Sequence, residues 1–222
     1  MKRFFFMPTT LSWGLFFLLI YSWLNWDFGY AFLVSVICGI AALITRKSGV
    51  PYRDTLKNDG EIYLSPVYGE VKSIRRNVQL PHIPGEGQEV RISISGWSAK
   101  GLYLPTAGEV TYLRATKGLK ISRDAEQLAF YRSMDDVAHT DFTLTSKNKT
   151  QTLMRFVDSK YGKRPTIWLK SGDRGRGAAC FGYYPFGGTL LIYLPNNSDI
   201  LIFEKEFVVP GQTVIAALKD SK

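Results

Sequence analysis

Cysteine and histidine are scarce in this chain of 222 residues. The two cysteines, Cys38 and Cys180, lie far apart in the sequence and predict no disulfide framework. His82 and His139 are the only histidines, which is too few for a zinc cluster. We interpret both as structural or surface residues rather than as the base of a Ser-His-Asp enzyme. The sequence therefore predicts no metal site.

Charge is almost absent from the first 45 residues. Lys2, Arg3 and Asp27 are the only charged residues before Arg46, so the later segment carries +8 of the formal net charge of +9. No Lys/Arg-rich run or nucleic-acid motif is present, so we expect no nucleic-acid partner. The basic balance favours contact with a membrane through its anionic phospholipids. A basic solvated surface without a dedicated partner is the alternative, and a protein partner or a homo-oligomer is compatible with the same composition.

The long uncharged run predicts two transmembrane helices, at about residues 10–25 and 28–44. The run is too long for one crossing of a ~30 Å hydrocarbon core, which needs about 20 residues. Polar residues around Asp27 divide it into two apolar arms. The alternatives are a cleaved signal peptide before an exported domain and a single long tilted helix.

Basic residues flank both ends of this run, so the positive-inside rule places both termini in the cytoplasm. We therefore expect residues 1–47 to form a helical hairpin in the inner (cytoplasmic) membrane. Residues 48–222 would then form a cytoplasmic domain.

Short alternating runs separated by Gly and Pro follow residue 48 and predict a β-rich domain. Strands are predicted at residues 62–65, 89–94, 102–104, 109–113, 166–169, 189–194 and 200–203. One short helix is predicted at residues 125–138, with Asp124 as its N-cap.

Two segments of this domain, residues 66–71 and 105–110, share the sequence Pro-x-x-Gly-Glu-Val. A related Pro210-Gly-Gln-Thr-Val sequence lies near the C-terminus. Each combines a Pro, which fixes φ, with a Gly, which permits positive φ, before a predicted strand. We interpret each as a tight turn that leads into a strand, and such repeated turns are typical of barrel-sandwich folds.

Several of these motifs resemble the phosphatidylserine decarboxylase family, particularly its short bacterial and archaeal type. Ser65-Pro-Val-Tyr-Gly-Glu-Val71 is similar to the Ser-Pro-Ala-Asp-Gly-x-Val of the family. The C-terminal motifs of the family are matched in order and spacing by Gly172-Asp173, Phe181-Gly182, Phe186-Gly-Gly-Thr189 and Tyr193-Leu-Pro195. The resemblance implies a mainly β, decarboxylase-like fold and a part in phosphatidylethanolamine synthesis.

The resemblance also implies where the reactive residues of the family would lie. The family proenzyme cleaves itself at a serine, with help from an Asp and a His, and the resulting pyruvoyl group is the electron sink for decarboxylation. Here the serine position is Gly188, the Asp position is Tyr68, and the His position is Lys100 or, in a second family pattern, Tyr103. Glycine has no side-chain oxygen, so cleavage cannot occur there. A variant pattern places Thr189 at the cleavage site, and we expect no pyruvoyl-type cofactor unless the chain is cut at that residue.

These substitutions predict a non-catalytic relative of the family that binds phospholipid headgroups or a membrane partner. Lys100, Arg174 and Arg176 are the candidate ligands of an anionic phosphate, with ordinary surface cations as the alternative. The second hypothesis is an active decarboxylase-type lyase that cleaves itself at Thr189. A third, a transport-adaptor barrel, would need a single anchor and a long helical hairpin inside the barrel, and neither is predicted.

Overall fold

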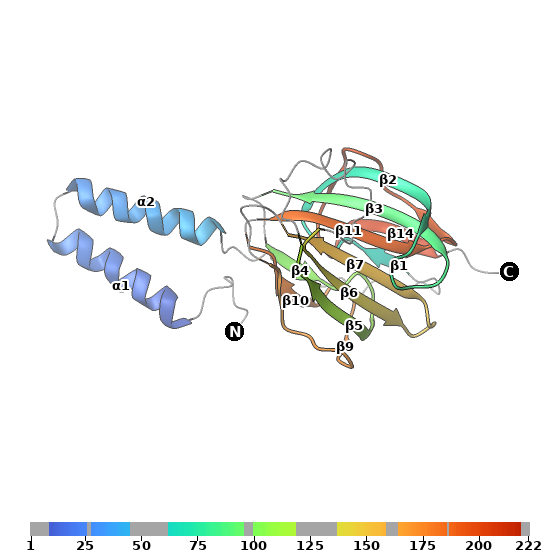
Figure 1. The fold of residues 1–222 in the computed structure, drawn as a ribbon. Helices are drawn as coiled ribbons and strands as arrows, with labels where there is room; N and C mark the ends of the chain where they lie inside the picture. The colour runs from blue at the N-terminus through green and yellow to red at the C-terminus, as the bar shows by residue number, and fades with distance from the viewer. Residues whose placement is uncertain are drawn as a thin grey trace.

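The protein was analysed as a computed structural model, which describes residues 9–25, 28–44, 62–95, 100–118, 137–158, 164–185 and 187–218. Two helices precede a domain built almost entirely of strands, so the predicted mainly β class is confirmed (Figure 1). The helices and strands are α1 (Thr9–Asn25), α2 (Phe28–Ile44), β1 (Ile62–Leu64), β2 (Gly69–Gln79), β3 (Glu86–Ile94), β4 (Gly101–Tyr103), β5 (Gly108–Thr116), β6 (His139–Ser146), β7 (Gln151–Val157), β8 (Thr166–Ile167), β9 (Arg174–Gly175), β10 (Cys180–Tyr183), β11 (Gly188–Pro195), β12 (Ser198–Ile200), β13 (Phe207–Val208) and β14 (Val214–Leu218).

The two helices lie side by side, and the indole nitrogen of Trp23 donates a hydrogen bond to the hydroxyl of Ser35 across them (Figure 1). Each has 17 residues and a length of about 26 Å at 1.5 Å per residue, less than the ~30 Å of a hydrocarbon core. Within the described residues, neither helix is long and apolar enough to cross a membrane. This finding overturns the prediction of a transmembrane hairpin at the inner membrane with cytoplasmic termini.

The strand predictions are confirmed for most segments. The strand predicted at 200–203 ends at Ile200, and the strand predicted at 166–169 ends at Ile167. The strands β6, β7, β9, β10 and β13 were not predicted. The predicted helix at 125–138 lies outside the described residues except for Val137 and Ala138, and neither of these is helical.

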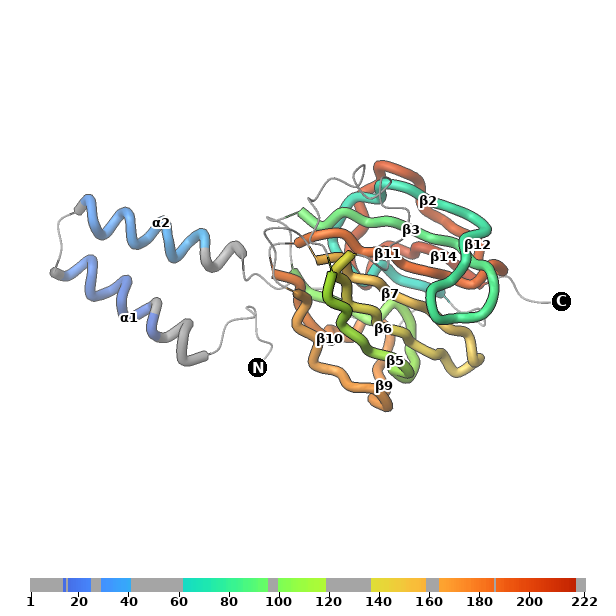
Figure 2. Tube along the Cα trace, in the orientation of Figure 1, coloured from blue at the N-terminus to red at the C-terminus, as the bar shows by residue number. Residues whose placement is uncertain are grey.

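Three antiparallel sheets surround the main core. The large sheet has eight strands in the order β13-β2-β3-β11-β7-β6-β5-β9, and the two small sheets are β1-β14-β12 and β4-β10-β8. Ile92, Leu144 and Ile192 point from the large sheet into the core, where they meet Tyr63 of β1 and Phe181 of β10. We call the other side of the large sheet its outer face (Figure 2).

The order of the strands shows an approximate internal twofold symmetry. The half-sheets β13-β2-β3-β11 and β9-β5-β6-β7 meet where β11 pairs with β7, and the two small sheets correspond strand for strand. At this centre Ile192 pairs with Met154, and the pairs on either side mirror each other. The second copy, β4 to β10, is continuous in sequence and is inserted between β3 and β11 of the first copy.

The two Pro-x-x-Gly-Glu-Val turns lie against each other and exchange equivalent hydrogen bonds. The amide of Leu64 donates to the carbonyl of Pro105 at 2.8 Å, and the amide of Tyr103 donates to the carbonyl of Pro66 at 2.9 Å. Each donor stands two residues before the Pro of its own turn. The sequence repeat therefore marks the symmetry of the fold.

The loops beside these turns repeat the same pattern. The amide of Lys205 donates a hydrogen bond to the carbonyl of Val71, and the amide of Gly172 donates one to the carbonyl of Val110, both at 2.7 Å. The strand pairing also shifts register directly after each acceptor, at Val71 in β2 and at Val110 in β5. Two copies of one supersecondary unit thus build the domain.

The glycines of the two turns are required for close approach rather than for positive φ. A Cβ at Gly69 would lie 2.4 Å from the carbonyl oxygen of Ser93, and a Cβ at Gly108 would lie 2.5 Å from that of Thr145. We expect Gly69→Ala and Gly108→Ala each to lower the free energy of unfolding by about 1–3 kcal/mol, because the carbonyl cannot move without disturbing the strand pairing. Urea unfolding of the full chain measures this.

The control is Gly177→Ala, because a Cβ at that position would have no neighbour closer than 3.6 Å. It should change the free energy of unfolding by less than about 1 kcal/mol. Equal effects of all three substitutions would contradict the assignment of close approach to the two turn glycines.

Candidate functional site

Two of the positions predicted from the resemblance lie at the end of β3. Gly188, the first residue of β11, pairs with Ile94, the last residue of β3. Lys100 is 1% exposed, and its ammonium group donates to the carbonyl of Ser95. The carbonyl of Lys100 accepts a hydrogen bond from the amide of Tyr184 at 2.9 Å. The structure therefore brings Gly188 and Lys100 to one end of the large sheet.

Tyr68 lies at the same end. Glu70 pairs with Ser93 in the ladder between β2 and β3, so the register continues to place Tyr68 opposite Ser95. The side chain of Tyr68 is half-buried. Tyr103, the alternative His position, is buried in β4, and its backbone belongs to the paired turns.

A side chain at Gly188 would require the buried ring of Tyr184 to move. A Cβ there would lie 2.3 Å from the phenolic oxygen of Tyr184, and the backbone φ of +157° is one that L-residues rarely adopt. The ring of Tyr184 is fully buried, and its hydroxyl donates to the carbonyl of Val157. Tyr184 therefore occupies the space that a serine side chain at position 188 would need.

Thr189 is buried in β11, between Ser93 of β3 and Val157 of β7. Because residues alternate along a strand, its side chain shares the outer face with Leu191. Neither Ser93 nor Val157 carries a base. His139 lies beyond Val157, at two strand spacings or about 10 Å from Thr189.

Arg174 and Arg176 lie far from Lys100. Arg174 forms an exposed ion pair with Glu109, with 2.8 Å between Nε and Oε2. The segment that carries Arg174 and Arg176 continues into residues 178–179, whose backbone is hydrogen-bonded to the backbone of Leu104. Leu104 is four residues from Lys100 along an extended segment, or about 13 Å. The three predicted phosphate ligands therefore do not form a single site.

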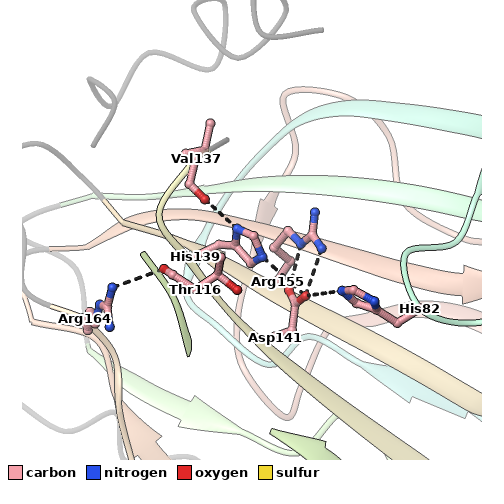
Figure 3. Close-up of polar contacts among 7 residues, drawn as sticks. All are labelled: His82, Thr116, Val137, His139, Asp141, Arg155 and Arg164. Atoms are coloured by element: carbon pink, nitrogen blue, oxygen red, sulfur yellow. Dashed lines mark hydrogen bonds and ion pairs between the residues drawn. The ribbon is translucent and has the colours of Figure 1, made fainter. Parts of the chain in front are cut away.

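A charged cluster that no sequence motif indicated lies on the outer face (Figure 3). Arg155 donates two hydrogen bonds to the carboxylate of Asp141, at 2.7 and 2.9 Å. The Nε2 atoms of His139 and His82 each lie 3.5 Å from Oδ2 of the same carboxylate. Nδ1 of His139 lies 2.6 Å from the carbonyl oxygen of Val137. The pairing of β6 with β7 and the position of the β2–β3 turn over the outer face bring these residues together, so no sequence motif could reveal them.

This outer-face cluster (Asp141, Arg155, His139 and His82) is not arranged for catalysis or for metal binding. Both ring nitrogens of His139 face acceptors of the cluster, so neither is directed at a nucleophile. The guanidinium group of Arg155 already occupies the carboxylate of Asp141. Within the residues that the structure describes, no three His, Cys, Asp or Glu side chains are grouped to hold a metal ion.

The cluster instead fastens the end of the hairpin between β2 and β3 to the outer face. His82 lies in this turn, and the neighbouring Leu80 and Ile83 pack against Leu153 and Leu191. The His82 ring also lies beside the ring of Tyr112 in β5, with 5.6 Å between the two ring centroids. Apolar contact and a charged contact thus act together to hold the hairpin end.

Burial alone would raise the pKa of Asp141, but hydrogen bonds and charges from His139 and Arg155 outweigh it and hold the pKa below its ordinary value. The internal twofold relates this pair to Glu89 and Tyr193 on β3 and β11. There burial raises the pKa of Tyr193, and the charge of Glu89 raises it further. The two halves of the outer face thus bury different polar pairs at equivalent positions.

We expect Asp141→Asn to lower the free energy of unfolding by about 3–5 kcal/mol at pH 7, because it leaves the Arg155 charge buried without its partner. A depressed folded-state pKa contributes stability above the unfolded value of about 3.9 and loses it as the pH falls through the folded value. The difference between wild type and Asp141→Asn should therefore shrink below about pH 4. Urea unfolding at pH 7 and at lower pH measures it.

The exposed Asp199 provides the control, since Asp199→Asn should have a small effect at every pH. A difference between wild type and Asp141→Asn that stays constant across the acid range would contradict the assignment.

No family model matches the sequence. The chain is 27% identical over 192 residues to the phosphatidylserine decarboxylase proenzyme of Symbiobacterium thermophilum, and the match covers 84% of each chain. The proenzyme of the same name from Neorickettsia sennetsu is 23% identical over 189 residues, which cover 83% of this chain and 81% of the relative. That of Amoebophilus asiaticus is 25% identical over 159 residues, which cover 71% and 68%. Several relatives of one name, matched over most of their length, agree with the motifs found in the sequence and support membership of the phosphatidylserine decarboxylase family.

Proposed function

We propose that this chain is a non-catalytic member of its family, which remains uncut and binds the surface of anionic phospholipids. The observation that carries the proposal is the contact between Gly188 and Tyr184. Position 188 has no hydroxyl to attack the preceding carbonyl, and the Tyr184 phenol lies 2.3 Å from where a Cβ would be. The residues present therefore do not fit a pyruvoyl group at this position.

The other two positions support the loss of chemistry. A general base must accept a proton in the reaction, and a carboxylate or an imidazole does this readily. Tyr68 offers a phenol instead, and Lys100 uses its ammonium group as a donor to the carbonyl of Ser95. Neither replaces the Asp or the His of the family.

The lipid part of the proposal rests on charge and on the names of the relatives. The segment from Arg46 onward carries a formal +8, and the relatives are named for an enzyme of a phospholipid. Lys100 is too deeply buried to contact a headgroup, whereas Arg174 and Arg176 are exposed. Binding would therefore use surface cations and not the former reaction centre.

A second candidate function is that of an active lyase that cleaves itself at Thr189. The observation in its favour is the backbone before that residue, because Gly187 and Gly188 have φ values of +70° and +157°. Backbone in such sparsely populated φ regions is often found at reactive sites. The Thr189 hydroxyl would attack the Gly188 carbonyl, the C–N bond would break to leave an ester, and the hydroxyl proton would pass to the freed amine. Elimination of the ester carboxylate would then cut the chain. Neither strand neighbour of Thr189, Ser93 or Val157, carries a base for that proton, which favours the first proposal.

Intact mass distinguishes the two candidates. We expect one uncut chain of 25.1 kDa that does not react with hydrazine probes and releases no carbon dioxide from phosphatidylserine. Two fragments that meet between Gly188 and Thr189 would overturn the proposal and assign the nucleophile to Thr189.

Introducing the missing hydroxyl tests the role of Tyr184 directly. We expect Gly188→Ser to remain uncut and to lower the free energy of unfolding by about 1–3 kcal/mol, since the new side chain overlaps the Tyr184 ring. In a Tyr184→Ala background the same substitution should cost less, with a coupling of about 0.5–3 kcal/mol in a double-mutant cycle. Urea unfolding of the four proteins gives the cycle.

Gly177→Ser is the control, because a Cβ at that position has no close neighbour. Equal costs of Gly188→Ser in both backgrounds would show that Tyr184 does not block the position. Cleavage of the single variant Gly188→Ser would show that the missing acid and imidazole are not needed.

A further inference from the structure

Exposed cations gather at the end of the large sheet opposite Gly188. Gly108 pairs with Ser146 on one side and with Gly175 on the other, so the β6–β7 turn and the β9 loop are neighbours (Figure 2). We call the exposed basic residues of these two segments the basic edge. They are Lys147, Lys149, Lys170, Arg174 and Arg176.

Both segments of the basic edge are held by backbone hydrogen bonds. In the first turn the amide of Lys149 donates to Ser146, and the amide of Ser146 donates to Thr150. In the second the amide of Lys170 donates to the carboxylate of Asp173 at 2.7 Å. The cations therefore project from fixed turns, which lowers the entropy lost when they contact a partner.

Acidic residues near the basic edge are fewer than the cations. Glu109 pairs with Arg174, and Asp173 is engaged with the backbone of its own turn. Lys147, Lys149 and Arg176 are exposed, and Asp173 is the one acidic residue among residues 147–150 and 168–178. An anionic surface would complement this edge.

The basic edge is separate from the former reaction centre. β6 extends from His139, near the Gly188 end, to Ser146, a distance of about 23 Å at 3.3 Å per residue. The internal twofold exchanges these two ends of the sheet. Binding at the edge therefore needs nothing from Tyr68, Lys100 or Gly188.

The internal twofold also provides a comparison within the molecule. The positions of Lys170 and Arg174 in the second copy correspond to those of Phe203 and Phe207 in the first. Phe203 makes the equivalent hydrogen bond in its own turn, where its amide donates to the carboxylate of Glu206. The turn thus forms equally well with an exposed phenylalanine, so folding does not require cations at the edge.

We propose that the basic edge is the surface through which this domain docks on an anionic phospholipid bilayer. The inference deepens the proposed function and rests on it. Each Lys or Arg held near an anionic bilayer gains roughly 1 kcal/mol, and five cations on two adjacent turns suit a broad surface rather than a single ion. Trp168, two residues before Lys170, is 51% exposed and is of the type found at membrane–water interfaces.

The test compares vesicle binding by the full chain and by two matched double variants. Lys147→Gln with Lys149→Gln removes two charges from the basic edge. Lys72→Gln with Lys205→Gln removes two charges from the other end of the sheet. Each pair contains one turn lysine with positive φ, +62° at Lys149 and +68° at Lys205, so the backbone demands also match.

We expect wild type to prefer vesicles that contain phosphatidylglycerol over pure phosphatidylcholine vesicles. The Lys147/Lys149 variant should bind the anionic vesicles roughly tenfold to thirtyfold more weakly, which is about 1 kcal/mol for each charge, while the Lys72/Lys205 variant should change by less than about threefold. Binding of all three proteins to neutral vesicles should stay the same. The anionic preference should weaken as salt rises, because exposed charges are screened over about 10 Å at 0.1 M.

Each outcome decides one of the two proposals. If wild type shows no preference for anionic vesicles, the lipid part of the proposed function fails. If wild type prefers them but both double variants weaken binding equally, net charge explains the preference and the basic edge is overturned as the docking surface. Unchanged binding by the Lys147/Lys149 variant overturns it as well.

Discussion

The antiparallel pairing of β7 with β11 is the contact on which the whole domain depends. It is the only strand pairing that joins the two half-sheets within the large sheet that the structure describes. The symmetry axis passes near Ile192 and Met154, both of which face the core and are almost completely buried. Backbone hydrogen bonds and core packing therefore converge on the same few residues. Loss of this pairing would leave two open four-stranded units.

The same pairing determines the chemistry that each end of the sheet can support. It sets Val157 beside Thr189 and brings the Val157 carbonyl to the Tyr184 hydroxyl. A buried phenol that is bonded to the backbone leaves no room for a side chain at Gly188. The position that the resemblance assigns to the reactive serine is therefore part of the close-packed interior.

Local features of the fold could be predicted from the sequence because they depend on neighbouring residues. Alternating apolar residues predicted β3 and β11, and the Pro-x-x-Gly-Glu-Val repeat predicted two turns at the start of β2 and β5. The turns formed as expected, although Gly69 and Gly108 are needed for close approach and not for positive φ. The close approach arises between strands that are distant in sequence, so the sequence could not show it.

Features that depend on pairing between distant segments could not be predicted. The outer-face cluster joins a hairpin turn to β6 and β7, and neither the partners of Asp141 nor the register of Arg155 follows from local pattern. The overlap of Tyr184 with position 188 needs coordinates as well. The apolar content of α1 and α2 was evident, but their length of 17 residues depends on where each helix begins and ends.

The insertion of one copy inside the other has a consequence for the order in which the domain is completed. The second copy is continuous, so its strands find partners soon after they leave the ribosome. In the first copy, Ile62 of β1 pairs with Ala217 of β14, and β3 pairs with β11, which is made roughly a hundred residues later. Non-local pairings of this kind form slowly and expose unpaired strand edges until they do. The early strands of the first copy therefore keep unpaired edges until the C-terminal strands have been synthesised.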